Sequence, residues 1–251
     1  MVRVIGIDCA TDPRRVGYAF ARFSDEHTIL EQVALGSPTR SPTAAIADWL
    51  GEGDAPALLA LDAPLGWPAA LAEALHTHRA GQLLPGESNT LFRRDTDRVV
   101  RDRIGKQSLD VGADRIARTA HAALQLLHQL RSRLGQPIPL AWFTPVSGVH
   151  TIEVYPAATL AAYGIDARGY KASPGGAHRE RVLSEISRRI TVHADVPDIE
   201  RASDGLDAAL CVLAAHDFVV GAAIAPNSNM SHHTEGWIWV RDPAAAANRE
   251  S

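Results

Sequence analysis

Two aspartates stand where an apolar, β-forming run of residues ends. Asp8 closes the run Ile5-Gly-Ile-Asp8, and Asp62 closes the run Leu59-Ala-Leu-Asp62; small residues follow both. Because the carboxyl ends of neighbouring parallel strands meet at one edge of a sheet, two such strands would place both carboxylates in one crevice. An aspartate in this position is also a common turn residue, so neither of the two is decisive alone.

Three further carboxylates have the same character. Glu153 lies within an apolar stretch, where an unpaired carboxylate is costly to bury. Asp204 and Asp207 are three residues apart and therefore share one face of a predicted helix, although they would also suit its N-terminal cap and dipole. Carboxylates held close together need a cation, and oxygen ligands suit Mg²⁺ or Mn²⁺.

Two such ions, about 3.5–4 Å apart, activate the attacking water and stabilise the leaving oxygen of a phosphodiester. The acidic residues therefore predict metal-dependent nuclease chemistry. The candidate catalytic residues are Asp8, Asp62, Glu153, Asp204 and Asp207. Asp8 is expected to bridge both ions, Asp62 and Asp207 to hold one each, and the other two to support them.

The pattern of apolar residues predicts the elements that must position these side chains. Strands are expected over 2–7, 16–23, 28–35, 57–61, 149–155 and, as a short late strand, 236–240. Helices are expected over 43–50, 112–134, 156–163, 178–190 and 203–220. This order predicts an α/β protein of the RNase H-like type: a mixed five-stranded sheet (three antiparallel strands plus two parallel) flanked by helices, with a mostly helical insertion over 67–140.

The composition excludes several other classes of protein. The chain has 251 residues, of which 46% are hydrophobic, and a formal net charge of -4, which excludes a mainly disordered chain. No apolar stretch reaches the roughly 18 residues of a membrane helix, and the first residues do not follow the order of a signal peptide. Two cysteines cannot form a disulfide framework or a four-sulfur zinc site. We expect a single cytoplasmic domain over 1–251 that ends in a flexible tail over 241–251.

Seven short motifs occur in an order that resembles a known family. They are Gly6-Ile-Asp8, Leu61-Asp-Ala-Pro64, Arg93/Arg94 with Asp97-Arg98, Glu153-Val-Tyr-Pro156, Tyr170-Lys171, Ser203-Asp-Gly-Leu-Asp-Ala-Ala209 and Glu235-Gly-Trp-Ile-Trp239. Together they resemble the bacterial and archaeal family called domain of unknown function 429, described as predicted nucleases of the RNase H fold. The resemblance implies a metal site at Asp8, Asp62 and Asp207, with Asp204 and Glu153 adjacent. RNase H itself carries a catalytic glutamate on the helix after its third strand, where this chain offers only Asp48 and Glu52.

The basic residues between the acidic motifs are candidate contacts to a nucleic-acid substrate. The segment 93–106 holds six basic and three acidic residues, and guanidinium groups suit phosphates. The same segment could instead be an internally paired surface. The candidate substrate-binding residues are Arg93, Arg94, Arg98, Lys171 and Arg179.

Two other functions remain as alternatives to a nuclease. One is a non-enzymatic binding module for nucleic acid or protein that keeps the acidic cleft. The other is a small-molecule phosphotransferase of the actin-like type, suggested faintly by the segment from Asp8 to Thr11. The sequence leaves open whether the partner is DNA or RNA; a homodimer is a further expectation for a junction substrate.

Overall fold

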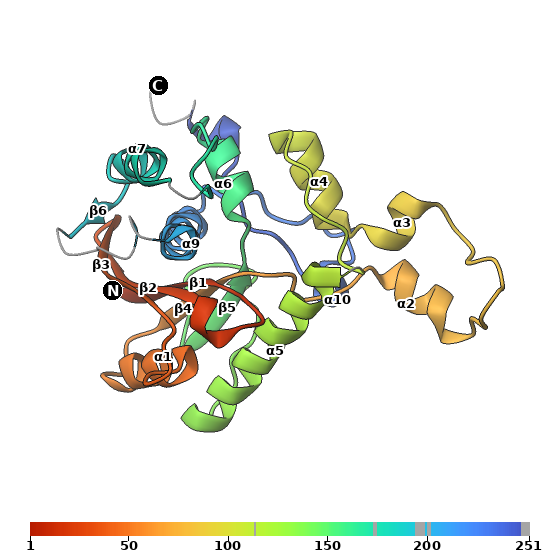
Figure 1. The fold of residues 1–251 in the computed structure, drawn as a ribbon, viewed down its shortest axis with the longest axis horizontal. Helices are drawn as coiled ribbons and strands as arrows, with labels where there is room; N and C mark the ends of the chain where they lie inside the picture. Colours follow the sequence, from red (N-terminus) through yellow and green to blue (C-terminus); the bar gives the residue numbers. More distant parts are fainter. Residues whose placement is uncertain (113, 173–174, 194–198, 200–201, 247–251) are drawn as a thin grey trace.

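The computed structural model describes the chain except for residues 113, 173–174, 194–198, 200–201 and 247–251. Its centre is a sheet with the strand order β5-β4-β1-β2-β3-β6 (Figure 1). The strands are β1 (Val2–Asp8), β2 (Gly17–Ser24), β3 (His27–Leu35), β4 (Ala57–Asp62), β5 (Val149–Glu153) and β6 (Thr191–Val192). β2 runs antiparallel to β1 and β3, whereas β1, β4 and β5 are parallel neighbours. This order and these directions confirm the RNase H-like mixed sheet.

Helices cover both faces of the sheet (Figure 1). One face packs against α1 (Pro42–Gly51) and α5 (Asp114–Leu134), and the other against α9 (Ser203–Val219). Outside α9 lie α6 (Pro156–Ala162) and α7 (Gly176–Ile186). The remaining elements are η1 (Pro13–Arg15), α2 (Ala69–His76), α3 (Ser88–Phe92), α4 (Asp95–Ile104), α10 (His232–Glu235) and η2 (Pro243–Ala246). No described helix has the length and apolar character needed to span a membrane.

The helical insertion between the fourth and fifth strands comprises α2, α3, α4 and α5, as expected. Its first part, with α2 and α3, projects sideways from the body of the molecule (Figure 1). The predicted flexible tail includes η2, and its last residues, 247–251, lie outside the described residues.

Two details of the predicted sheet need correction. The sheet has a sixth strand, because the two-residue β6 pairs with β3 in parallel. The segment 236–240 is not a strand: it forms one isolated bridge, between Ile238 and Glu153. The backbone N–H of Ile238 donates to the Thr96 hydroxyl at 2.8 Å. This bond takes the place of a regular ladder partner, and the flanking Trp237 and Trp239 are both buried.

Two glycines allow α9 to lie directly on the sheet. A Cβ atom on Gly6 in β1 would lie 2.0 Å from the backbone oxygen of Ala208, and one on Gly17 in β2 would lie 2.1 Å from that of Asp204. Neither distance is compatible with a side chain. The first two turns of α9, which carry its acidic residues, therefore approach the ends of β1 and β2 because glycine occupies these two positions.

We expect Gly6→Ala to lower the free energy of unfolding by about 2–3 kcal/mol, because the added methyl group overpacks the contact between α9 and β1. Urea unfolding followed by circular dichroism measures this loss. Gly51→Ala is the matched control: Gly51 lies in α1, and a Cβ atom there meets nothing within 4 Å. The control is expected to be neutral or stabilising by up to about 1 kcal/mol. Equal stability of the two variants would contradict the close contact.

Candidate active site

Asp8 and Asp62 are direct neighbours at the carboxyl edge of the sheet. In the parallel pairing of β1 with β4, Asp8 lies opposite Asp62. Side chains alternate along a strand, so Asp8 lies on the same face of the sheet as Val4, and Asp62 on the same face as Leu58 and Ala60. This is the face that α9 covers. The two carboxylates line a hollow of about 330 Å³. This register places Asp8 and Asp62 in one crevice at the strand ends, as expected.

Asp207 of α9 lies close enough to these two aspartates for its charge to raise the pKa of both. Its side chain is only 2% exposed and is held at both oxygens. The Tyr170 hydroxyl donates to Oδ1 at 2.9 Å, and the Lys171 ammonium lies 2.8 Å from Oδ2. Asp204, one turn earlier on α9, is more exposed and has Arg15 of η1 at 3.7 Å. The predicted pair on one face of the helix thus consists of one buried carboxylate, Asp207, and one partly exposed carboxylate, Asp204.

The buried carboxylates oppose each other's ionisation. Burial raises the pKa of Asp8 well above its usual value, and the charges of Asp62, Asp207 and Asp204 raise it further. Burial and the charge of Asp207 raise the pKa of Asp62 to about 8. Burial also raises the pKa of Asp207, although Lys171 and the Tyr170 hydroxyl oppose this shift. One lysine therefore does not compensate the three negative charges.

The Lys171 ammonium interacts electrostatically with all three aspartates. Burial alone would lower the pKa of Lys171, but the ion pair with Asp207 and the charges of Asp62 and Asp8 outweigh it and raise that pKa. The ammonium therefore stays charged and remains against the carboxylates.

The donor set suits a hard divalent cation, but the side chains are not drawn together around one. Within the described residues, no group of three or more His, Cys, Asp or Glu side chains is placed to hold a metal ion. In that same part of the chain, Asp8 and Asp62 make neither a side-chain hydrogen bond nor an ion pair, while both oxygens of Asp207 are engaged. Oxygen ligands and excess negative charge are what Mg²⁺ or Mn²⁺ requires. The residues fit such an ion in their chemistry, with Lys171 already beside one of the ligands.

Glu153 lines the hollow together with Asp8 and Asp62 but, unlike them, is paired with a buried arginine. The Arg94 guanidinium donates to both Glu153 oxygens, at 2.8 and 2.7 Å, and to both oxygens of Asp97, at 3.1 Å each. Arg94 is 1% exposed. In β5, Glu153 pairs with Leu61 and not with Asp62, although its charge still contributes to the raised pKa of Asp62. Each is the other's ion-pair partner, so a supporting role of Glu153 at a metal ion and a substrate contact of Arg94 stay predictions.

The buried acidic groups of this network hold the segment that follows Asp62. The backbone N–H of Leu65 donates to Glu153 at 2.9 Å. Glu235 of α10 accepts from the N–H groups of Ala69 and Asp95, each at 2.8 Å. The two glutamates thereby fix the path of the chain from β4 into the helical insertion. Glu153 is a positioning residue for the end of β4.

The other predicted substrate-binding arginines are also engaged inside the molecule. Arg93 donates to Asp110 at 3.1 Å, and Arg98 pairs with Asp95. Both remain partly exposed, so a substrate contact stays a prediction for them. Arg179 is buried and donates to the backbone oxygens of Tyr170 and Ala172, and its predicted contact with substrate stays a prediction. The alternative interpretation of the basic segment 93–106, an internally paired surface, therefore describes much of this segment.

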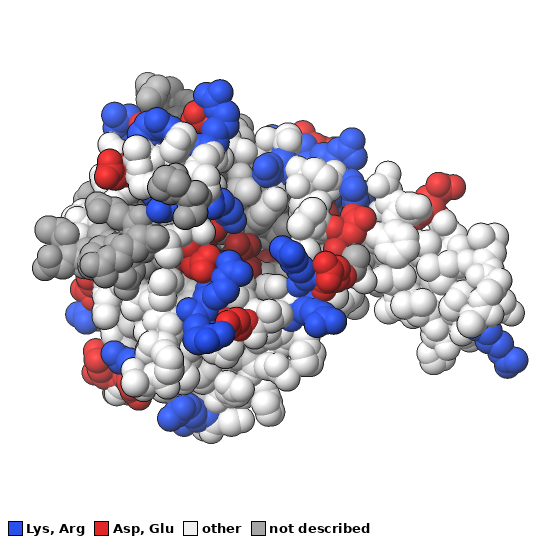
Figure 2. Space-filling model, in the orientation of Figure 1, with Lys and Arg blue, Asp and Glu red and all other residues white. Residues whose placement is uncertain are grey.

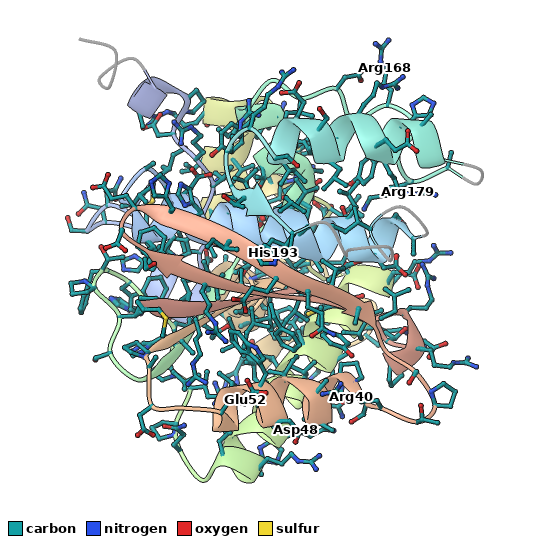
Figure 3. The ribbon with its side chains drawn as sticks, turned by 90° about the vertical axis from the view of Figure 1, so that its left-hand side faces the viewer. Arg40, Asp48, Glu52, Arg168, Arg179 and His193 are labelled. Carbon is teal, nitrogen blue, oxygen red and sulfur yellow. The ribbon has the colours of Figure 1, made fainter. Side chains whose placement is uncertain are left out.

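Charge is distributed unevenly around the acidic hollow. Figure 2 shows acidic side chains near the centre of this face, with basic side chains on either side. Helix α1 adds no carboxylate to the site: Asp48 and Glu52 are exposed and lie across the sheet from α7 (Figure 3). The position that supplies a catalytic glutamate in RNase H is therefore without an equivalent on α1 in this chain.

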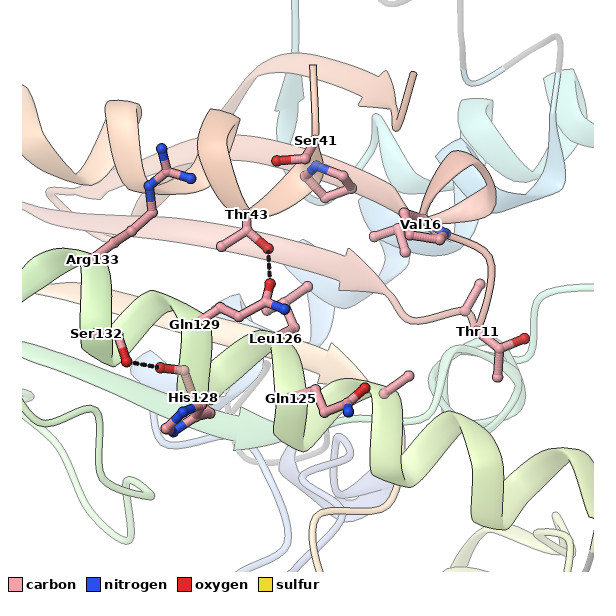
Figure 4. A pocket seen from close by; sticks show the side chains of 14 residues that line it. Thr11, Val16, Ser41, Thr43, Gln125, Leu126, His128, Gln129, Ser132 and Arg133 are labelled. Carbon is pink, nitrogen blue, oxygen red and sulfur yellow. Dashed lines mark hydrogen bonds between the residues drawn. The ribbon is translucent and has the colours of Figure 1, made fainter. Parts of the chain in front are cut away.

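A second hollow of about 450 Å³ lies between α1, α5 and η1 (Figure 4). The linings of the two hollows have no residue in common but include close neighbours in the sequence. Thr119 of α5 and Cys9 line the acidic hollow, whereas Ala122 and Ala10 line the second one. The second hollow has no acidic residue in its described lining, which includes Thr11, Thr43, Gln125, Gln129 and Arg133. Gln129 accepts a hydrogen bond from Thr43 at 3.0 Å across it (Figure 4).

Comparison with known proteins establishes the family. A family model described as "Protein of unknown function (DUF429)" matches residues 6–231. The chain belongs to this family. Among curated proteins, no sequence matches it.

Among solved structures, the structure of this DUF429 family member is similar to that of T. thermophilus RuvC in complex with a Holliday junction substrate. The two chains are 14% identical, with a TM-score of 0.37, and the likeness covers 86% of this chain and 94% of that one. The fold assignment rests on the strand order and directions of the sheet and not on a likeness of this extent.

Some residues of the DUF429 site have roles that their types alone do not indicate. The Tyr170 phenol and the Glu235 carboxylate act through contacts with residues 37 and 140 or more positions away in sequence. Both lie in motifs that carry the family resemblance, which is the one sequence signal that marks them. Gly6 belongs to the same kind of motif, and its close approach to α9 gives the physical reason for a glycine there.

Proposed function

We propose that this protein is a nuclease that hydrolyses phosphodiester bonds with divalent metal ions held by carboxylates. The observation that carries the proposal is the placement of Asp8 and Asp62 in one hollow, with Asp207 of α9 close enough that its charge raises the pKa of both. Their pKa values are raised by burial and, for Asp8 and Asp62, by neighbouring carboxylates, so the folded protein carries an unmet demand for positive charge. Burying such groups is costly and is typical of functional sites.

Asp8 would be shared by two Mg²⁺ or Mn²⁺ ions, with Asp62 and Asp207 holding one each. Bound ions supply an activated water and stabilise the leaving oxygen of the phosphodiester. Asp204, at the rim, would act through water. Glu153 would position Asp62 through the Leu65 N–H, and the Tyr170 hydroxyl would orient Asp207.

A nucleic acid is the proposed partner because the second hollow, between α1, α5 and η1, suits a sugar–phosphate chain. Its described lining offers hydroxyl groups, amides and the Arg133 guanidinium, with no carboxylate to repel phosphate. The part of α5 from Thr119 to Arg133 is about 20 Å long at 1.5 Å per residue, enough for several nucleotides. Because α5 contributes residues to both hollows, its length supports a substrate longer than a single nucleotide.

We expect Asp8→Asn to abolish both Mn²⁺ binding and metal-dependent cleavage while leaving the fold intact. The amide has no charge and offers one oxygen where the carboxylate offers two. Isothermal titration with Mn²⁺ measures binding without a guess about substrate. A panel of labelled DNA and RNA oligonucleotides, single-stranded, duplex and junction, measures cleavage. Asp48→Asn, on the exposed side of α1, is the matched control and should behave as the wild type.

Two outcomes would count against this function. Full cleavage by a purified Asp8→Asn variant would remove Asp8 from the chemistry. Tight oligonucleotide binding that persists in chelator, with no cleavage of any substrate on the panel, would favour the non-enzymatic binding module.

A further inference from the structure

The two oxygens of Asp207 are occupied by two consecutive residues, Tyr170 and Lys171. The tyrosine is buried, whereas the lysine side chain is 59% exposed although its ammonium touches a carboxylate that is 2% exposed. The lysine therefore reaches into the site from solvent. The tyrosine is part of the core that holds Asp207.

A dedicated contact fixes the backbone that carries Lys171. Arg179 of α7 donates through one nitrogen, Nη1, to the backbone oxygens of Tyr170 and Ala172, at 3.0 and 3.2 Å, on either side of the lysine. A Cβ atom on Gly175 would lie 2.4 Å from the backbone oxygen of Ala172 and 2.6 Å from that nitrogen, so a side chain at this position would disturb the contact. A buried arginine thus holds the turn, while the lysine side chain extends from it.

The Lys171 ammonium is positively charged and lies beside Asp207, where the proposed metal ion would bind. It lies against Asp207, and its charge interacts favourably with Asp62 and Asp8 as well. A divalent cation bound by the same aspartates would repel this ammonium and would need the Asp207 oxygen that the lysine holds. An ammonium on a flexible, half-exposed stem can leave for water at little cost, unlike a guanidinium fixed at two points.

We propose that Lys171 is an internal counter-ion that competes with the metal: it occupies Asp207 in the metal-free protein, and binding of the divalent ion displaces its side chain into solvent. This inference rests on the proposed metal site and adds its regulation. Metal affinity is then set by the difference between two cations competing for one carboxylate. The protein exchanges a lysine for a metal, so that Asp207 has a cation in both states.

The test uses a feature of the composition, since Lys106 and Lys171 are the only lysines in the sequence. Lys171→Gln removes the competing charge, and Lys106→Gln is the same change away from the acidic hollow. In isothermal titration with Mn²⁺, Lys171→Gln is expected to lower the dissociation constant about tenfold or more, which corresponds to about 1.4 kcal/mol. Lys106→Gln is expected to match the wild type.

The possible results separate this inference from the proposed function. If the wild type binds Mn²⁺ and Lys171→Gln binds it equally or more weakly, the competition is overturned and the metal site stands. If the wild type, Lys106→Gln and Lys171→Gln all fail to bind Mn²⁺, the metal site itself is overturned, and the competition with it.

Chemical labelling of lysine gives a second readout on the unmodified protein. Reductive methylation followed by mass spectrometry reports how accessible each amine is. Lys171 should be labelled slowly in chelator and several-fold faster with saturating Mn²⁺, whereas the rate at Lys106 should not change. An unchanged Lys171 rate, under conditions where calorimetry shows bound Mn²⁺, would show that the lysine is not displaced.

Discussion

Arg94→Leu is expected to lower the free energy of unfolding by about 3–5 kcal/mol, a large share of the stability of a typical domain. The arginine is 1% exposed and is the shared partner of Asp97 and Glu153. Leucine would leave both carboxylates buried without their cation. Chemical denaturation at pH 7 measures the loss. Arg98→Leu is the matched control: its pair with Asp95 is partly exposed, so the expected change is within about 1 kcal/mol.

The loss caused by Arg94→Leu should also depend on pH. Burial already raises the pKa of Glu153, and the charge of Arg94 opposes this shift. Without the arginine, the folded-state pKa of Glu153 rises further above its unfolded value. A raised carboxyl pKa favours the folded state at low pH, and this benefit is lost as the pH rises through the folded pKa. The variant should therefore be closer to the wild type at pH 5 than at pH 8; a deficit that does not change with pH would contradict this account.

Asp62→Asn is expected to make the metal-free protein more stable at pH 8, by about 3–5 kcal/mol, which corresponds to a rise in Tm on the order of 10 °C. The pKa of Asp62 is raised to about 8 in the folded protein, while the unfolded chain has the ordinary value near 4. Between these values the folded state binds the extra proton, so wild-type stability falls by up to about 1.4 kcal/mol per pH unit as the pH rises. Asparagine is neutral at every pH and removes this contribution.

The measurement is a series of thermal or urea unfolding curves from pH 4 to pH 8 in the presence of chelator. Asp48→Asn, exposed on α1, should follow the wild type to within about 0.5 kcal/mol throughout. Saturating Mn²⁺ should raise the stability of the wild type at pH 8 and narrow the gap, since a bound cation relieves the same repulsion. A variant whose stability falls with pH as steeply as the wild type would show that Asp62 is not the strained group.

The two stability predictions have opposite signs because the two acidic groups are compensated differently. Glu153 has a buried arginine, so removing the cation costs stability. Asp62 makes no ion pair among the described residues, so removing its charge is expected to restore stability. A buried charge that lowers stability, such as that of Asp62, is typical of a functional site, whereas a compensated one such as that of Glu153 is typical of a structural ion pair.

Local sequence was sufficient to predict the elements that carry the site. An apolar run ending in aspartate predicted both β1 with Asp8 and β4 with Asp62, because the strand pattern and the position of its last residue are properties of a short segment. The helical spacing placed Asp204 and Asp207 at the start of α9, as found. The order of strands and helices then predicted the RNase H-like sheet, since few chain paths connect such elements without crossings.

What each charged side chain contacts was decided only by the tertiary structure. The sequence offered Glu153 and Arg94 as separate candidates, 59 residues apart, for metal and substrate; the register of β5 against β4 and the burial of α4's first turn pair them with each other. Likewise, nothing local shows that Lys171 reaches Asp207 or that Arg179 holds its backbone. A charged group is neutralised by whichever opposite charge the fold brings within a few ångströms, and that distance is a property of the packed chain and not of any segment.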